Sequence, residues 1–336
     1  MSATILDVAV LANVSKATVS RAFSSPDKVN PDTRKRIMEA ARRLQYQPNA
    51  LARAMITKQS GNFAFIIYGE QAPVITNPFY GEILESVVNT TVEMNRSMFI
   101  VSDDKIRTEA ASLVLQKQVD GIIFASQPNS EMLLRSSEKG IPHVLINHMT
   151  DLTESYSLLC DDYGGMKQAV DHLAELGHRR IGFLNGYFTE FIKQRRYQGF
   201  VQAMAQNNLR FDPDIAATGG ISVQEAIEST KSLLLRENPP TAVICANDTI
   251  AVGAMKAVSR MGLRVPEDFS VIGFDDSSFC TMSEPELTSI RIDKQRMGQL
   301  AVECLVAQIE KRDWLYPTIT METNIIVRDS TAPCKQ

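Results

Sequence analysis

From Phe63 onward, short apolar runs alternate with helical stretches, and this alternation constrains the fold more than any other feature of the chain. Seven runs show it: 63–68, 97–102, 121–125, 143–146, 180–184, 242–245 and 270–274. Strands apolar on both faces, each followed by a helix, predict parallel sheets covered by helices on both sides. About 270 residues are more than one such unit usually holds, so we expect two α/β lobes. Ligands of such folds bind at the C-terminal strand ends, which predicts a site in the crevice between the lobes.

Residues 1–46 show a different, purely helical pattern. Thr4 is suited to cap a first helix, and Asn13 tolerates the left-handed backbone of a tight turn after it. Ser15 is a good cap for a second helix over 16–23, whose outward face is small, polar and basic. A third helix follows, with a proline at its first position. Two short helices joined by a tight turn, with a third packed across them, predict a small all-α helix-turn-helix domain.

The charge of the chain is divided unevenly. The formal net charge is −4, from 35 Lys and Arg against 39 Asp and Glu, which by itself argues against nucleic-acid binding. Residues 1–58, however, carry ten basic and four acidic side chains and so stand at +6, which leaves −10 for the rest. A basic N-terminal segment on an acidic body predicts that duplex DNA contacts residues 1–58 alone. The alternative is a helical bundle with a solvated basic face.

Other protein classes fit the sequence poorly. No apolar run approaches the length of a membrane span, and the N-terminus, which soon meets Asp7, does not read as a signal peptide. The five cysteines are odd in number and scattered, which is typical of a reducing cytoplasm. The four histidines make no pair at metal-ligand spacing, and adjacent acids such as Asp275 and Asp276 point in different directions. We therefore expect a cytoplasmic protein that is not an enzyme, without metal or cofactor.

Two N-terminal stretches resemble the lac/gal repressor family of bacterial transcriptional regulators. TILDVAVLANVSKATVSRAF (4–23) closely matches the opening pattern of that family, and YQPNALARAM (46–55) matches its hinge. Asn13 stands where the family usually has glycine. Met55 stands where many members carry a leucine that wedges into the minor groove, a role its apolar side chain also suits.

The hinge, residues 47–59, is predicted to contain a short helix. Pro48 disfavours helix just before it, and Asn49 can cap a turn or two through Ala54. So short a helix is marginal alone in water and would form only against DNA and the hinge of a partner subunit. The alternative is a plain interdomain linker.

The helix faces and the resemblance together imply the DNA contacts. In the second helix, Lys16 and Arg21 can reach phosphates or guanine edges, and Ala17 can pack on a thymine methyl group. The full set of expected DNA-binding residues is Thr4, Leu6, Ser15, Lys16, Ala17, Thr18, Ser20, Arg21, Lys28, Asn30 and Thr33 in the head, with Asn49, Ala52, Arg53 and Met55 in the hinge. Two heads of a homodimer would read a pseudo-palindromic operator.

Five later stretches resemble the core of the same family, which is similar to periplasmic sugar-binding proteins. They are NPFYGEI (77–83), DHLAELGHRRIGFLNG (171–186), RRYQGF (195–200), CANDTIAVGAMKAVSRMGLRVPEDFSVIGFDD (245–276) and PELTSIRID (285–293). The resemblance implies an effector-binding and dimerisation core over 60–336, with lobe one at about 60–160 plus 293–320. Lobe two takes about 162–290 plus 322–330, with crossovers near Asp161, Ile292 and Met321.

An effector site follows from strand-end positions and from the resemblance. The expected contacts are Phe79, Tyr80, Ser126, Asp161, Lys193, Arg196, Ile221, Asn247 and Asp275. Carboxylates and carboxamides span adjacent hydroxyls, a guanidinium offers a fork of donors, and an aromatic face covers sugar C–H groups. Three of these residues have alternatives: Asp275 and Asn247 could cap the elements that follow them, and Asp161 could be a crossover turn residue.

Two departures bear on the ligand. Ile221 replaces an aromatic pocket wall found in many members of the family, which makes a planar purine a poorer fit. Lys193 and Arg195 near the entrance predict an effector with a carboxylate or phosphate, such as a sugar acid, or else a solvated loop.

The leading hypothesis is a repressor of a carbohydrate-utilisation operon that responds to a sugar or a sugar-derived effector. The alternatives are a solute-binding protein without operator function, or a regulator that answers to a nucleoside or purine. The chain after Arg328 has no leucine heptads, so we expect a dimer rather than a coiled-coil tetramer.

Overall fold

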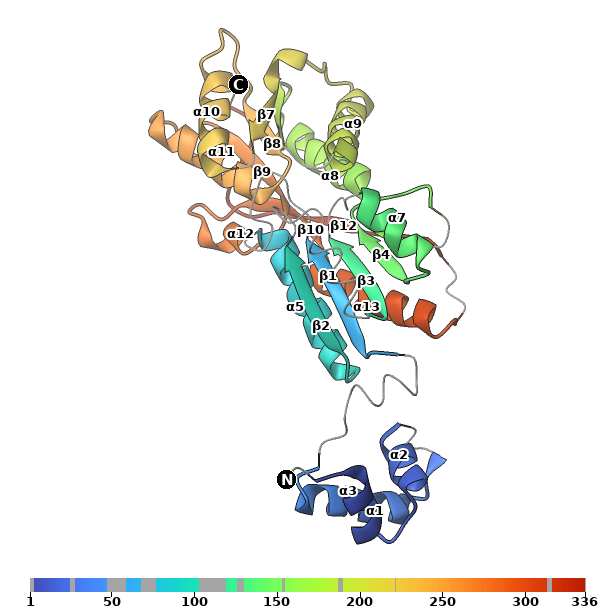
Figure 1. The fold of residues 1–336 in the computed structure, drawn as a ribbon. Helices are drawn as coiled ribbons and strands as arrows, with labels where there is room; N and C mark the ends of the chain where they lie inside the picture. Colours follow the sequence, from blue (N-terminus) through green and yellow to red (C-terminus); the bar gives the residue numbers. More distant parts are fainter. Residues whose placement is uncertain are drawn as a thin grey trace. The chain divides into compact units, whose positions relative to one another are not determined.

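The computed structural model describes residues 3–24, 28–46, 59–67, 77–102, 119–125, 130–152, 155–186, 190–220, 222–312 and 316–335. These residues fall into two compact units (Figure 1). One unit ends at Asn62 and includes 119–120, and the other holds the remaining residues from Phe63. No described helix is long and apolar enough to cross a membrane.

The first unit contains the three predicted helices, α1 (Ile5–Leu11), α2 (Lys16–Ser24) and α3 (Pro31–Arg43). Thr4 and Asp7 form a reciprocal capping box at the start of α1, and Asn30 caps α3 through Asp32 and Thr33. Asn13 has a φ of 51°, as its place in the turn requires. The helices enclose a small core of Val8, Ala9, Ala12, Val19, Ala22, Val29, Ile37, Ala40 and Ala41.

The first sheet of the core belongs to lobe one and has the strand order β11-β5-β4-β3-β1-β2. Its strands are β1 (Asn62–Ile67), β2 (Ser97–Ser102), β3 (Gly121–Ala125), β4 (His143–Ile146), β5 (Tyr156–Cys160) and β11 (Thr318–Met321). Every pair in this sheet whose register is described is parallel. Its helices are α5 (Pro78–Glu93), α7 (Ser130–Glu138) and α13 (Lys294–Ile309), and α5 packs along α13.

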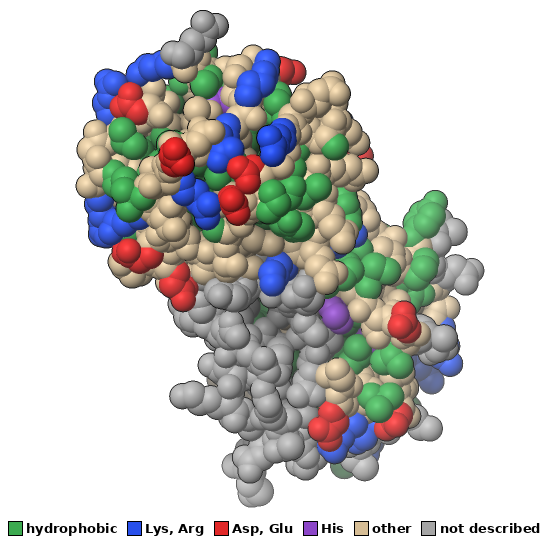
Figure 2. Space-filling view, turned by 90° about the horizontal axis from the view of Figure 1, so that it is seen from above, with side chains coloured by type: hydrophobic (Ala, Val, Ile, Leu, Met, Phe, Trp, Pro, Cys, Tyr) green, Lys and Arg blue, Asp and Glu red, His purple; other side chains and the backbone are tan. Residues whose placement is uncertain are grey.

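The second sheet belongs to lobe two and has the order β12-β10-β9-β8-β6-β7. Its strands are β6 (Ile181–Gly186), β7 (Ala216–Gly220), β8 (Ala242–Cys245), β9 (Ser270–Asp275), β10 (Thr288–Ile292) and β12 (Thr323–Ile326). The strands pair in parallel except β12, which is antiparallel to β10. Its helices are α8 (Asp162–Glu175), α9 (Glu190–Gln206), α10 (Val223–Leu234), α11 (Asp248–Arg260) and the short α12 (Phe279–Met282). Basic and acidic side chains are interspersed on the face shown in Figure 2.

Three chain crossings join the lobes: β5 to α8, β10 to α13, and β11 to β12. Two of them are bonded to each other, because Asp161 N donates to Met321 O at 3.0 Å and Thr323 Oγ1 donates to Asp161 O at 3.2 Å. Every predicted strand is present. Five observed strands are not among the seven predicted runs: β5, β7, β10, β11 and β12. The sequence of β7, AATGG, lacks large apolar residues altogether. The helix α9 begins at Glu190, and α13 ends at Ile309.

Candidate effector site and DNA-binding face

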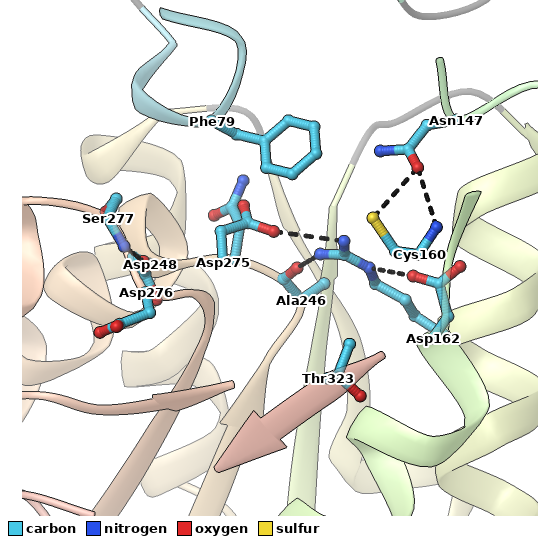
Figure 3. A network of polar contacts seen from close by, with 12 residues as sticks. Phe79, Asn147, Cys160, Asp162, Ala246, Asp248, Asp275, Asp276, Ser277 and Thr323 are labelled. Atoms are coloured by element: carbon cyan, nitrogen blue, oxygen red, sulfur yellow. Dashed lines mark hydrogen bonds and ion pairs between the residues drawn. The ribbon is translucent and has the colours of Figure 1, made fainter. Parts of the chain in front are cut away.

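The centre of the core site is Arg196, on the second turn of α9 and only 3% exposed. Its Nε donates to Asp162 Oδ1 at 3.0 Å, and its terminal nitrogens donate to Asp275 Oδ1 at 3.3 Å and to the Ala246 carbonyl (Figure 3). The guanidinium carbon lies 3.8 Å from the centroid of the Phe274 ring. Burial opposes the charge of Arg196, but the two carboxylates outweigh it and raise its pKa. A fixed, fully ionised guanidinium therefore joins the C-terminal ends of three strands, β5, β8 and β9.

Asp275 ends β9 with a φ of 105°, a conformation that L-residues rarely adopt. Burial raises the pKa of its carboxyl group to about 7, although Arg196 lowers it. The next carboxyl, on Asp276, points elsewhere and accepts from Arg291 and Arg328. These hydrogen bonds outweigh its partial burial and lower the pKa of Asp276. The adjacent acids thus have separate roles, as their sequence spacing predicted.

Lobe one supplies the aromatic side of the site. Asn77 caps α5 by accepting from Phe79 N at 3.0 Å, which fixes Phe79 and Tyr80 in the first turn. Both side chains are buried, with ring centroids 5.0 Å apart in an edge-to-face arrangement. The charges of Asp275 and Arg196 act on the Tyr80 hydroxyl, and Phe79 is drawn above Asp275 in Figure 3. Two polar groups of lobe two and an apolar ring of lobe one thus come together, the combination that a polyol needs.

Asn147 and Cys160 are further members of the site that sequence reasoning missed. Asn147 follows β4 with a φ of 54°, and its Oδ1 accepts from the backbone N and the Sγ of Cys160 at 3.3 and 3.1 Å. Burial raises the pKa of both the Cys160 thiol and the Tyr80 hydroxyl, and a hydrogen bond with Asn147 partly offsets it in each. Asn147 directly follows a predicted strand and Asn247 stands two residues after another, so the same signal could have found Asn147.

Asp161 and Asn247 are both helix caps. Asp161 Oδ1 accepts from Gly164 N at 2.9 Å, and Asn247 Oδ1 accepts from Ile250 N at 2.9 Å. The contact of Asn247 matches the capping role given to it above as an alternative. Asp161, for which a turn residue at the crossover was the alternative, caps α8 at that crossover. Asp162, one position later, is the acid that reaches Arg196. Effector contact by Asp161 or Asn247 stays a prediction.

Lys193 and Arg195, both expected near the entrance of the effector site, lie in different surroundings. Lys193 lines a surface cavity of about 260 Å³ on lobe two, together with Asn185, Tyr197 and Thr218. Arg195 instead donates to Asp162 Oδ2 at 3.0 Å, on the other oxygen of the carboxylate that Arg196 uses. Of the two basic residues expected at the entrance, Arg195 is the one beside the buried cluster. Two other expected contacts, Ser126 and Ile221, lie outside the described residues.

An aromatic contact also crosses between the lobes. The rings of His148, after β4, and Phe191, on α9, lie 6.2 Å apart in an edge-to-face arrangement. The Arg195 guanidinium stands over Phe191 at 5.4 Å and over Tyr163 at 5.0 Å. Burial lowers the pKa of His148, so its ring is neutral near pH 7. Among the residues described, no group of three or more His, Cys, Asp or Glu could hold a metal ion.

The DNA-binding face predicted for the first unit is exposed on α2. Lys16, Ala17 and Arg21 are exposed, whereas Val19 and Ala22 face the core. Ser15 caps α2 by accepting from Thr18 N at 3.1 Å, and the two hydroxyls are also bonded to each other. The other expected contacts in the head, Thr4, Leu6, Ser20, Lys28, Asn30 and Thr33, are all at least partly exposed. Asn49, Ala52, Arg53 and Met55 lie outside the described residues.

Comparison with known proteins agrees with this architecture. Residues 4–49 match the family model described as "Bacterial regulatory proteins, lacI family", and 170–331 match a periplasmic binding protein-like domain. A transcriptional repressor of Haemophilus influenzae, PurR, is 33% identical over 98% of both chains. The chain belongs to the LacI family. The family resemblance and the two-lobed fold with a helix-turn-helix head, both predicted from the sequence, are thereby confirmed.

Two solved structures of transcriptional regulators are similar over nearly the whole chain. A complex of the transcriptional regulator CelR with cellobiose has 27% identity and a TM-score of 0.75, covering 98% of this chain and 99% of CelR. The lac repressor dimer bound to operator and an anti-inducer has 25% identity and a TM-score of 0.83, covering 99% of this chain and all of the repressor chain.

Proposed function

We propose that this protein is a dimeric, sequence-specific DNA-binding repressor of a carbohydrate-utilisation operon. A small sugar or sugar-derived effector, bound between the two lobes, controls its affinity for the operator. The observation that carries the proposal is the buried cluster of Arg196, Asp162 and Asp275. Phe79 of lobe one is drawn above Asp275 in Figure 3. Buried charges at the C-terminal ends of parallel strands are where such folds bind ligands.

The chemistry of the cluster favours a polyhydroxylated ligand. Asp275 offers a carboxylate to neighbouring hydroxyls, Arg196 holds it in place and offers donors, and Phe79 can cover the apolar face of a sugar ring. The CelR complex supports a sugar, since its ligand is cellobiose. A nucleoside or purine ligand stays the alternative to be tested.

On the DNA side, Lys16, Ala17 and Arg21 of α2 would enter the major groove, and the hinges of two subunits would meet near the operator centre. The similar structure of a lac repressor dimer bound to operator supports operator binding by a dimer. Effector and operator would then share one coupling free energy, reciprocal between the two sites and about 1–3 kcal/mol.

An acidic effector, such as a sugar acid, is a second candidate because of Arg195. This guanidinium is 22% exposed and shares Asp162 with Arg196, so two cations flank one carboxylate. Calorimetric titration with gluconate and with neutral sugars separates the two ligand classes. Tight binding of a neutral sugar that Arg195→Met and Lys193→Ala both leave unchanged would rule out the acidic ligand.

A gel shift with the DNA upstream of the gene, with and without candidate sugars, tests the whole proposal. We expect salt-sensitive binding that at least one sugar changes. Absence of salt-sensitive binding to any operator fragment would refute the repressor function and leave a solute-binding protein.

A further inference from the structure

Lys294 is a buried cation that contacts both lobes. It is the first residue of α13, directly after the crossing from β10, and is 4% exposed. Its Nζ donates to the carbonyl oxygens of Asp275 at 2.6 Å and Asp276 at 2.9 Å, in lobe two. The same Nζ pairs with Glu82 Oε2 at 3.3 Å, on α5 of lobe one. All three donors of one ammonium group are therefore used, two of them across the lobe boundary.

The position is unfavourable for a lysine on grounds of helix stability alone. A positive charge in the first turn opposes the helix dipole. Burial of an ammonium group costs free energy that a single carboxylate partner rarely repays. What Lys294 has that an apolar side chain lacks is its set of three N–H donors.

The carbonyl groups that Lys294 holds belong to an unusual piece of backbone. Asp275 and Asp276 have φ values of 105° and 47°, both in the region that L side chains rarely adopt. Such a conformation persists where the surroundings fix it. Lys294 bonds both carbonyls and so helps to hold Asp275 with its carboxylate toward Arg196.

In lobe one, Lys294 belongs to a closely packed pair of helices, α5 and α13. Ser86 Oγ donates to Gln295 O at 2.6 Å, and a Cβ on Gly298 would come within 2.6 Å of the Ser86 side chain. The helices α5 and α13 therefore cross in close contact. Glu82 lies one turn after Phe79 on α5, so the pair with Lys294 is joined to the turn that carries Phe79 and Tyr80.

We propose that Lys294 is an inter-lobe latch: a positioning residue that ties the Asp275 strand end of lobe two to α5 and α13 of lobe one. If the lobes separated, the two hydrogen bonds from Lys294 to the carbonyl oxygens of Asp275 and Asp276 would have to break. The ion pair with Glu82 would remain, because both residues belong to lobe one. The latch thus sets how readily the crevice opens. This inference rests on the proposed function in taking Asp275 as an effector contact.

The test measures the distance between the lobes in the full-length protein without effector or DNA. Spin labels at Val92→Cys and Leu235→Cys, both exposed and on different lobes, report it by pulsed electron resonance. Cys334, the one free cysteine of the described residues that is not buried, is replaced by serine. Lys294→Met is compared with wild type and with the exposed control Lys256→Met.

We expect Lys294→Met to raise the ratio of long to short inter-lobe distances about tenfold or more, because one hydrogen bond to a charged group is worth such a factor. Lys256→Met should leave the distribution unchanged. If Lys294→Met does not fold, Lys294→Gln, which keeps an N–H donor, should give a smaller rise. A distribution equal to that of wild type in the folded variant, even with a lower melting temperature, would overturn the latch. The gel shift tests the repressor function independently of the inter-lobe distances. The proposed function and the role of Lys294 can therefore each be refuted without the other.

Discussion

The neighbouring residues Arg195 and Arg196 allow a matched pair of substitutions. Arg196→Met would leave the carboxylates of Asp162 and Asp275, 3% and 7% exposed, without their shared guanidinium, and the Ala246 carbonyl without a donor. Removing one partner of a buried ion pair costs about 3–5 kcal/mol. Arg195→Met removes a partly exposed side chain and leaves Asp162 still paired with Arg196, so about 1 kcal/mol is expected.

Thermal unfolding at pH 7.5, followed by far-UV circular dichroism, measures this difference. For a core of this size, 3–5 kcal/mol corresponds to a fall in melting temperature of roughly 6–15 °C. Arg195→Met should shift it by roughly 2–4 °C. Equal shifts for the two variants, or a shift under about 2 °C for Arg196→Met, would contradict the view that Arg196 neutralises both carboxylates.

Four further predictions concern function and pH. Arg21→Ala should abolish operator binding in a gel shift and leave effector affinity within about twofold in calorimetry, because the two sites lie in different units. Arg196→Ala should keep operator binding but lose the response to effector; a normal response would mean that the pocket is misplaced. The folded pKa of Asp275, about 7, lies above the unfolded value near 4, so its contribution to the unfolding free energy is complete below about pH 4 and is lost as the pH rises through about 7. Urea titrations from pH 4 to 8 should therefore show a decline, by up to about 1.4 kcal/mol per pH unit, that Asp275→Asn reduces, and an unchanged pH dependence would count against the raised pKa. Operator affinity should fall steeply with salt, with a slope reflecting about six to ten neutralised phosphates per dimer, whereas a slope near zero would contradict DNA contact by the basic head.

Local patterns were enough to predict most of the fold. The apolar runs from Phe63 onward marked the strands, since a strand buried on both faces must be apolar along its length. Capping residues such as Thr4 and Ser15 marked helix starts, because a cap bonds to backbone within three residues. The strand β7 escaped prediction because AATGG has small side chains, and its pairing with β6 supplies what its own sequence does not.

The sequence by itself determined that this chain has a basic helix-turn-helix head and a two-lobed α/β core, and that polar residues stand at the strand ends of that core. Only the tertiary structure decided which of those residues meet. It directs Asp162 rather than Asp161 to Arg196, adds Asn147 and Cys160, and takes the Lys294 amine to the carbonyl of Asp275. The sequence determines the strands and helices because the residue patterns that specify them repeat within a few positions along the chain. The direction of a side chain at a strand end, in contrast, depends on φ values, helix caps and partners far away in sequence.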